Sequence, residues 1–175
     1  EWTRAFNPMA RVGWPSVFRN QVTIRQDTLN SPVQWLIDGA SSSTIGFSIT
    51  PEGFNGTMRP AVQFGNFLVA DSGYFAGLTG YQSPSMASLG YPSFGGTVNG
   101  WTPSYFQGRV YSLHNQKLNA HNPTTGAVLW SVDAPYTSLE SDPCLADGLA
   151  VLNLNGRLRA IDLSSQSLRW SSIET

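Results

Sequence analysis

An internal repeat with a period of forty residues constrains this chain more than any other feature. When residues 103–130 are shifted by forty, they align without a gap with residues 143–170, so that Trp130 falls on Trp170. A fixed period of this length is typical of propellers and other repeat arrays, in which each repeat is one small unit that stacks on the next. The repeat therefore indicates the architecture well and the function poorly.

Each repeat reads as a small antiparallel sheet. In the second repeat, the apolar run 149–154 is followed by Asn155-Gly156, a dipeptide that accepts positive φ at both central turn positions and so closes a two-residue hairpin. Residues 157–161 then return as the next strand, and residues 167–170 follow a turn that begins with Asp, a residue favoured there. We therefore predict an all-β fold, a β-propeller built of four-stranded antiparallel blades.

Weaker signals extend the repeat toward the N-terminus. Asp27 precedes Trp35 by eight residues, as Asn122 precedes Trp130, and Trp2 precedes Pro15 by thirteen residues, as Trp130 precedes Pro143. We predict a single propeller or partial propeller with blades at 15–35 (with a loop over 36–59), 60–89, 103–130 and 143–170, and with residues 1–14 ending a preceding blade. Four blades are the lower edge of the ~4–8 that propellers use, so the chain is either a small ring or four sheets of a larger one.

Residues 120–130, Ala-His-Asn-Pro-Thr-Thr-Gly-Ala-Val-Leu-Trp, resemble the tryptophan-docking motif of PQQ-like (quinoprotein-type) propeller repeats, Ala-x-Asp-x-x-Thr-Gly-x-x-x-Trp. Asn122 replaces the Asp of the motif. In the next repeat Ala, Asp and Trp match, while Ser165-Gln166 replaces Thr-Gly. In the family, the Trp of one blade packs against the neighbouring blade and ties the blades into a ring. The resemblance implies blade-docking roles for Trp2, Trp35, Ala120, Gly126, Trp130, Ala160, Asp162 and Trp170.

The resemblance also implies specific burial. We expect Trp130 and Trp170 to be buried between neighbouring sheets. In the weaker repeat at 60–89, Leu89 stands where the Trp is expected. Because residues 143–170 already carry their own closing strand, we further predict that the chain does not close a ring by itself.

Composition excludes several classes of function. Charged residues make up only 12% of the chain, against roughly 25% in ordinary soluble domains. The net charge of −1, without a basic cluster, argues against nucleic acid as a partner. No apolar stretch approaches the ~20 residues that span a bilayer, so we predict no membrane insertion. The single cysteine, Cys144, is expected to be a small buried hydrophobe rather than a reactive thiol.

The sequence carries no recognisable catalytic motif. His114 and His121 lie seven residues apart and could share a metal, but no carboxylate or thiol is close in sequence, and we interpret them as polar surface or edge residues. Glu140 and Asp142 precede Pro143 in what we interpret as a solvated loop. We predict no catalytic residues, no cofactor and no bound metal. Aromatic residues that are candidates for binding loops are Trp14, Tyr81, Tyr91 and Trp101.

Three functions stay open at this point. In the resembling family, quinone-dependent dehydrogenases hold a cofactor and calcium on the propeller axis, and this chain has no vicinal cysteines and no residues that match the calcium ligands. The non-catalytic branch, which includes an envelope scaffold lipoprotein, fits better. We therefore predict a non-catalytic propeller that acts as a structural or protein-interaction module in a larger assembly, with protein subunits (copies of itself or other chains) as partners. An envelope, cell-surface or virion setting, outside the cytoplasm, is favoured.

Two alternatives complete these hypotheses. The chain could be a fragment or subunit of a quinone-dependent dehydrogenase. It could also be a carbohydrate-binding propeller that stacks glycans on the four loop aromatics.

Overall fold

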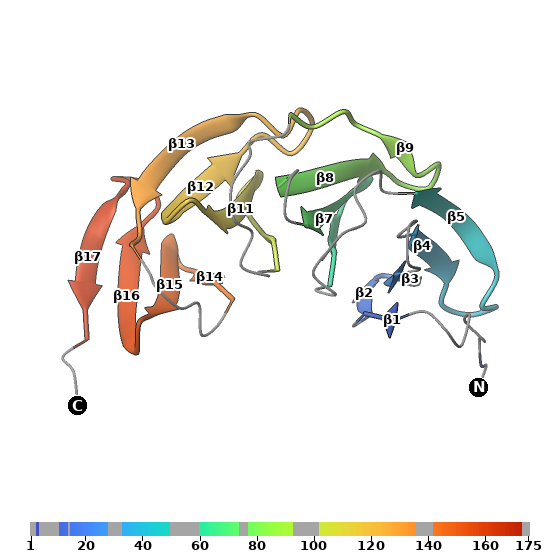
Figure 1. Ribbon diagram of the computed structural model, residues 1–175, viewed down its shortest axis with the longest axis horizontal. Helices are drawn as coiled ribbons and strands as arrows, with labels where there is room; N and C mark the ends of the chain where they lie inside the picture. The colour runs from blue at the N-terminus through green and yellow to red at the C-terminus, as the bar shows by residue number, and fades with distance from the viewer. Residues whose placement is uncertain are drawn as a thin grey trace.

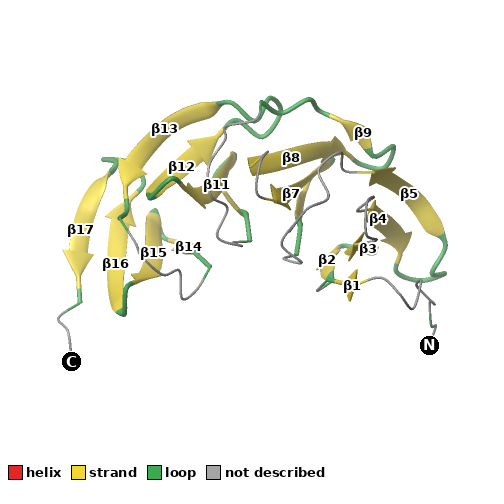
Figure 2. Ribbon diagram, in the orientation of Figure 1, coloured by secondary structure: helices red, strands yellow, loops and turns green. Residues whose placement is uncertain are grey.

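The described part of the chain is an array of short antiparallel sheets. The computed structural model describes residues 3, 11–13, 15–27, 33–49, 60–73, 77–92, 102–135 and 142–172. Within these residues every regular element is a β-strand and no helix occurs (Figure 2). The predicted all-β propeller architecture is confirmed.

The strands form four sheets that follow one another along the chain. Sheet 1 contains β1 (Arg11–Val12), β2 (Ser16–Phe18), β3 (Gln21–Asp27), β4 (Val33–Asp38) and β5 (Thr44–Ile49). Sheet 2 contains β6 (Val62–Phe64), β7 (Phe67–Gly73), β8 (Gly77–Gln82) and β9 (Ala87–Ser88). Sheet 3 contains β10 (Ser104–Phe106), β11 (Arg109–His114), β12 (Lys117–His121) and β13 (Val128–Asp133). Sheet 4 contains β14 (Cys144–Ala146), β15 (Leu149–Leu154), β16 (Arg157–Asp162) and β17 (Ser167–Ser171).

The sheets are arranged side by side in an open arc (Figure 1). In sheets 2 to 4 the four strands pair in chain order, and the last strand of each sheet, such as β13 or β17, runs along the convex side of the arc. Sheet 1 and sheet 4 lie at opposite ends of the arc. Sheet 1 and sheet 4 therefore each have one face that is not packed against another sheet of the described residues.

Turn chemistry explains why the strands end where they do. Asn155 and Gly156 have φ of 55° and 74°, so the predicted two-residue hairpin with positive φ at both positions is confirmed. Asn115 and Gln116 make the equivalent hairpin in sheet 3, with φ of 50° and 58°. The second position therefore accepts a residue other than glycine in this fold.

A second turn, before the outermost strand, repeats around the arc. Its first residue is Asp38, Asn122 or Asp162, and each side-chain oxygen accepts the backbone N–H groups two and three residues further on. Hydrogen bonds from the hydroxyl of Ser164 and the N–H groups of Ser165 and Ser164 lower the pKa of Asp162 to about 2. These turns position the outer strands in sheets 1, 3 and 4.

The fourth residue after the start of this turn has positive φ in every sheet. It is Ser42, Met86, Gly126 or Gln166, with φ of 59°, 58°, 70° and 56°. Gln166 therefore adopts the same conformation as Gly126, which explains how sheet 4 keeps the turn although it lacks the Thr-Gly of the motif.

Sheet 1 differs from the sequence-based expectation. Residues 36–59 were predicted to be a loop after a shortened blade, but residues 36–38 end β4 and residues 44–49 form β5. The Asp27–Trp35 spacing was misleading, because Trp35 lies in the third strand of its sheet and Asp38 holds the turn position. Residues 11–12 also pair with β3 of sheet 1 instead of a preceding blade, because β3 extends beyond the short β2 and leaves an open edge.

Two apolar clusters hold the arc together. The larger one contains side chains of sheets 2, 3 and 4, among them Val69, Leu118 and Leu152, all with no exposed surface. The smaller one joins sheets 1 and 2 and contains Leu36 and Leu68. The core therefore lies between the sheets, and each internal junction is an apolar sheet-on-sheet contact.

Candidate interaction surfaces

Neighbouring sheets are joined by a hydrogen bond that recurs at their innermost strands. The hydroxyl of Ser16, the first residue of β2, donates to the carbonyl of Ala61, the residue before β6. Ser104, the first residue of β10, donates in the same way to the carbonyl of Pro143, with 3.4 Å between the oxygens. The first residue of an inner strand therefore faces the following sheet.

Asp142 adds a second link between sheets 3 and 4. Its carboxylate accepts the N–H of Thr102 at 2.7 Å and the hydroxyl of Thr102 at 2.9 Å. The expected solvated role is therefore wrong for Asp142, whose carboxylate is used to join two sheets. Glu140 lies outside the described residues.

Tyr91 forms the aromatic contact between sheets 2 and 3. Its hydroxyl donates to the carbonyl of Pro123, and burial raises the pKa of its phenol above the usual value. The ring is so close to Gly80 of β8 and Gly126 of the next sheet that a Cβ on either glycine would lie within 2.5 Å of it. Tyr91 thus wedges between two sheets.

The candidate loop aromatics are therefore not a common binding loop. Tyr81 was expected to be accessible and is instead 1% exposed, in the cluster between sheets 1 and 2. Tyr91 is partly buried between sheets 2 and 3. Trp14 and Trp101 lie outside the described residues. The period-two alternation of β8 turns Tyr81 toward the neighbouring sheet, which explains the difference.

Sheet 3 presents an apolar face to sheet 4. Ala120 lies opposite both Tyr111 and Trp130, so these three residues share that face. The rings of Tyr111 and Trp130 meet edge to face with 5.8 Å between their centroids. Leu118, also on this face, is 0% exposed. Trp130 is partly buried in this junction, in the larger core cluster.

The corresponding face of sheet 4 is open. We call it the trailing face, and it consists of Cys144, Val151, Asn153, Leu158, Ala160 and Trp170, which strand pairing places on the side away from sheet 3. Leu158 is 46% exposed and Trp170 is 43% exposed. The expectation that Trp170 is buried is therefore wrong for this chain, because no described sheet of the chain covers that side.

Cys144 is also exposed, contrary to expectation. It is the first residue of β14 and thus holds the position of Ser16 and Ser104, which face the following sheet. In the sequence, the apolar neighbours Pro143 and Leu145 had suggested that Cys144 is buried. The thiol is exposed because it lies on the trailing face.

Sheet 1 carries an open face at the other end of the arc. We call it the leading face, and it consists of Val17, Val22, Ile24, Trp35, Ile37 and Phe47, which pair across β2 to β5 on the side away from sheet 2. The face is open in part: Val17 is 70% exposed and Phe47 is 54% exposed, whereas Ile37 is 2% exposed. Val22, Ile24 and Trp35 are partly buried. The rings of Trp35 and Phe47 pack with 5.3 Å between their centroids, and the indole N–H of Trp35 donates to the side-chain oxygen of Gln26. Trp35 was predicted to close a blade, and it lies instead at the centre of this face.

The remaining predicted docking residues lie at junctions or turns. Ala120 and Ala160 are fully buried at equivalent positions, Gly126 contacts Tyr91, and Asp162 forms the turn before β17. Trp2 lies outside the described residues. The structure thus brings Ala120 and Trp130 together as cross-strand neighbours, and likewise Ala160 and Trp170.

His114 and His121 are buried, not surface residues as expected. His114 is 2% exposed and His121 is 0% exposed. The imidazole of His121 bonds the hydroxyl of Ser112 at 2.7 Å and the carbonyl of Gly126 at 3.0 Å. Burial, with a contribution from nearby His121, lowers the pKa of His114 to about 3, and burial also lowers the pKa of His121. Both imidazoles are therefore held neutral inside sheet 3.

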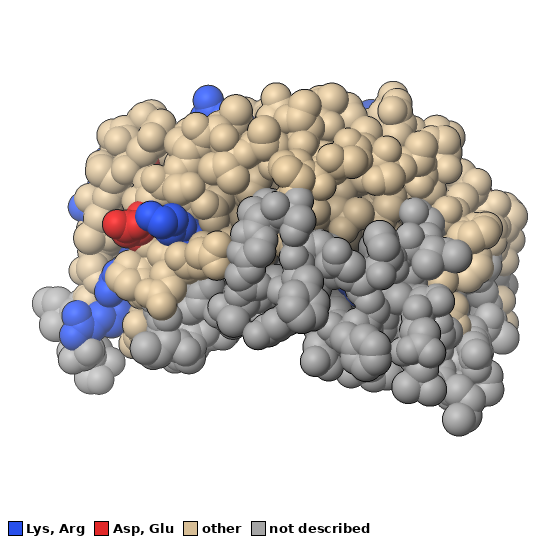
Figure 3. Space-filling model, turned by 45° about the horizontal axis from the view of Figure 1, so that its top comes forward, with Lys and Arg blue, Asp and Glu red and all other residues tan. Residues whose placement is uncertain are grey.

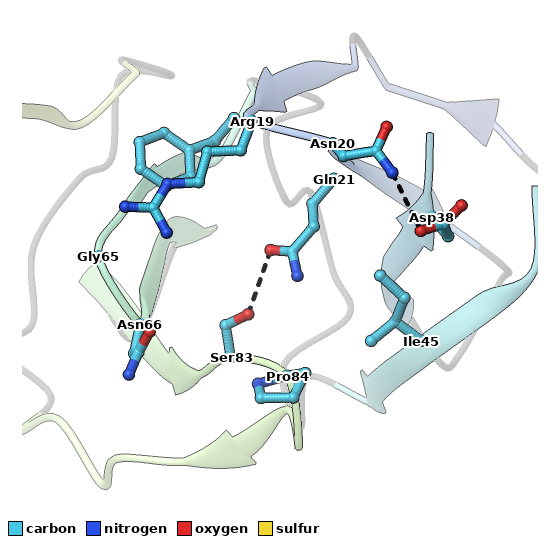
Figure 4. A pocket seen from close by; sticks show the side chains of 10 residues that line it. Arg19, Asn20, Gln21, Asp38, Ile45, Gly65, Asn66, Ser83 and Pro84 are labelled. Carbon is cyan, nitrogen blue, oxygen red and sulfur yellow. Dashed lines mark hydrogen bonds between the residues drawn. The ribbon is translucent and has the colours of Figure 1, made fainter. Parts of the chain in front are cut away.

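A polar pocket of about 310 Å³ lies between sheets 1 and 2 (Figure 4). Gln21 accepts hydrogen bonds in it from Ser83 and Gln63, and Asn20 donates to Asp38 at 3.2 Å. Arg19 covers the ring of Phe18 with 5.2 Å between guanidinium and centroid. The hydrogen bonds from Ser83 and Gln63 to Gln21 join sheet 2 to sheet 1 at this pocket.

Charged groups are sparse on the described surface. Figure 3 shows a face on which few acidic or basic side chains appear. Nowhere in the described part of the chain do three His, Cys, Asp or Glu side chains gather closely enough to hold a metal ion. The described residues also include no helix long and apolar enough to cross a membrane.

Sequence reasoning missed several residues of these surfaces. Val17 and Phe47 belong to strands that were not recognised as such, and Leu158 was seen as a strand residue without an assigned face. The cross-sheet role of Tyr91 was also missed. The alignment of Leu158 with Leu118 was a usable signal, because it marks an apolar position that both repeats keep.

Comparison with known proteins identifies the fold. No protein-family model and no curated protein sequence matches the chain. Among solved structures, BamB from Moraxella catarrhalis matches with a TM-score of 0.70 and 12% identity, over 87% of this chain and 49% of BamB. The computationally designed protein Ika8 matches with a TM-score of 0.72 and 12% identity, over 90% of this chain and 48% of Ika8. The designed protein Ika4 matches with a TM-score of 0.67 and 12% identity, over 90% of this chain and 94% of Ika4.

The chain thus spans about half the length of BamB and of Ika8, and nearly the whole length of Ika4. At these identities the likeness concerns the fold alone. It agrees with the sheet topology and the forty-residue repeat in identifying the chain as a β-propeller structure.

Proposed function

We propose that this chain is a non-catalytic propeller module that binds protein through its open sheet faces. The observation that carries the proposal is the trailing face. Leu118 is fully buried by the next sheet, whereas Leu158, at the same repeat position, is 46% exposed beside the exposed Trp170. Large apolar side chains gathered on one face mark interaction sites, and an aromatic among them is typical of interface cores.

The same proposal includes a relationship to PQQ-like repeats. Its support is the motif at residues 120–130, the repeated turn at Asn122 and Asp162, and the contact of Trp130 with the junction to the next sheet. We assign the docking roles of Ala120, Gly126, Ala160 and Trp170 on this basis. The likeness to BamB, a solved structure of the same fold, is compatible with this assignment.

A setting in an envelope, on a cell surface or in a virion is part of the proposal. Its support is compositional, namely 12% charged residues and a surface solubilised by Gly, Ser, Thr and Asn. Protein subunits are the proposed partners, and the low net charge makes apolar contact the main source of affinity.

The test is whether the exposed apolar side chains of the trailing face bind an apolar ligand. The monomeric form of the purified chain should bind an apolar fluorescent dye, and Leu158→Arg should lower that binding by the share that the trailing face contributes. Leu129→Arg is the matched control, because Leu129 is 50% exposed on the internal sheet 3 and its counterpart in sheet 4 is already Arg169. A monomer that binds no dye, or that binds it equally well after Leu158→Arg, would contradict the proposal.

A further inference from the structure

The leading and trailing faces carry the two halves of one repeated junction, and we propose that they bind each other between two copies of this chain, which together close a ring of eight sheets. This inference rests on the proposed function, since it names the partner of the trailing face.

The innermost strands supply the first correspondence. At two internal junctions, Ser16 and Ser104 donate to the carbonyl of the residue before the next inner strand. Cys144 holds the donor position on the trailing face, where a thiol is a weak donor. Pro15 holds the acceptor position, because it directly precedes β2 as Pro143 precedes β14. A second copy therefore places the carbonyl of its Pro15 against the Cys144 thiol of the first.

The side chains beside this hydrogen bond correspond as well. Between sheets 2 and 3, Phe64 stacks on Tyr105 with 3.9 Å between ring centroids. At the two ends of the arc the same positions are occupied by Ala146, on the trailing side, and Val17, on the leading side. Both are exposed and apolar, and both are smaller than the aromatic residues at the equivalent internal positions.

The centres of the two faces are apolar on both sides. On the trailing face the large side chains are Leu158 and Trp170, and on the leading face they are Trp35 and Phe47, with Ile24 beside them. At the internal junction of sheets 3 and 4, Leu118 and Trp130 pack in the same way against an apolar sheet. Docking the two end faces therefore repeats an existing type of contact and removes the exposed side chains of Leu158, Trp170 and Phe47 from water.

Ring closure follows from the direction of the contact. A contact between the trailing face of one copy and the leading face of the next is a head-to-tail contact. Such a contact builds a closed ring or an open filament, depending on the rotation that relates the copies. The arc in Figure 1 opens to one side, with its two end sheets both facing that side, so a two-fold rotation brings each end of one copy opposite an end of the other. The eight sheets that result lie within the ~4–8 that propellers use.

The solved structures are consistent with this size. The match to this chain covers 48% of Ika8, so the Ika8 chain is about twice as long as the four-sheet arc. The match covers 94% of Ika4, so an arc of this size makes up almost the whole Ika4 chain.

Sedimentation and light scattering test the stoichiometry. The chain should form a species of twice its 19.0 kDa mass and nothing larger. Leu158→Arg on the trailing face and Val17→Arg on the leading face should each convert the dimer to monomer, because a ring needs both faces of both copies. Leu129→Arg should leave the dimer intact, and circular dichroism should show that all three variants keep their strand content.

Cross-linking tests which residues meet. Pro15→Cys should form a disulfide with Cys144 of the other copy under mild oxidation, giving a covalent dimer on a non-reducing gel. Leu129→Cys, in an exposed position far from the proposed contact, should give no such dimer.

The outcomes separate this inference from the proposed function. A monomer whose trailing face binds dye would overturn the second-copy proposal and leave the protein-binding role, with the remainder of a longer polypeptide or a different subunit as the partner. Open filaments, or a dimer that survives both Arg variants, would also overturn it. A monomer that binds no dye would overturn both proposals.

Discussion

Sheets 3 and 4 are two copies of one repeat. Their equivalent side chains differ most in exposure on the face that sheet 4 covers in sheet 3 and that no described sheet covers in sheet 4. Leu118 and Leu158 occupy the same position, yet one is fully buried and the other is 46% exposed. Trp130 lies partly buried in a junction, while Trp170 lies on an open face. The second repeat therefore has the same apolar residues at a face that no described sheet of the chain covers.

The opposite faces of the two sheets differ in chemistry instead of exposure. Sheet 4 places Leu152, Leu154 and Ile161 toward sheet 3, and all are buried. At the same positions, sheet 3 carries Ser112, His114 and His121, also buried. A junction therefore tolerates polar residues when their hydrogen bonds are supplied, as they are for His121, whereas the apolar residues of the other face are present even where that face is open.

The largest expected effect concerns the leucine pair. Leu118→Ala should lower the free energy of unfolding by about 2–5 kcal/mol, the usual cost of truncating a fully buried leucine. Leu158→Ala, measured by urea denaturation at a concentration where the chain is monomeric, should change it by about 0.5 kcal/mol or less, as for other exposed sites. Equal losses would show that both positions are covered within one chain.

The histidines of sheet 3 should make stability depend on pH. The pKa of His114 is lowered to about 3 in the folded chain, against an ordinary value near 6.5 when unfolded, so between these values the unfolded chain binds a proton that the folded chain does not. Stability should therefore be complete above pH 6.5 and fall as the pH drops toward 3, by about 2 kcal/mol for His114 between pH 7 and pH 5.

The variant His114→Leu, which copies Leu154 from sheet 4, should reduce this pH dependence. Thermal melts at pH 5 and pH 7 give the measurement. If wild type and variant lose the same stability on acidification, another group is responsible.

A smaller effect distinguishes the two outer turns. Gly126→Ala should cost more than about 1 kcal/mol, because an alanine in the left-handed region is strained and its Cβ would collide with the ring of Tyr91. At the equivalent position, Gln166→Gly should change stability by about 0.5 kcal/mol or less, since glycine relieves the positive φ but loosens the unfolded chain. Chemical denaturation of both variants checks the pair, and a harmless Gly126→Ala would argue against the Tyr91 wedge.

Local signals in the sequence were enough to predict the fold. The hairpin at Asn155-Gly156 and the Asp162 turn are made by residues adjacent in the chain, so their chemistry can be interpreted without knowing the rest of the structure. Sheet 1 could not be predicted in the same way. Five residues separate β3 from β4, against two between β11 and β12, so the forty-residue alignment breaks there and Trp35 was assigned the wrong strand.

The contacts between sheets were harder to predict than the sheets. Tyr91 lies two residues beyond Leu89, the position that the alignment assigns to the docking Trp, and its partners Gly80 and Gly126 are brought together only by the fold. The exposure of Cys144 and Trp170 likewise depends on whether a further sheet covers them, which no residue pattern within the repeat encodes. Burial between sheets is a property of the arrangement and not of the motif.

The reactivity of Cys144, the single cysteine, tests the central claim most directly, because its thiol lies on the trailing face. The rate of labelling by a thiol reagent should be high in dilute solution, where the face is open, and should fall as the protein concentration rises and a second copy covers it. In Leu158→Arg the rate should stay high at every concentration. A labelling rate that is the same for the wild-type chain at all concentrations would contradict the claim that two copies meet on this face.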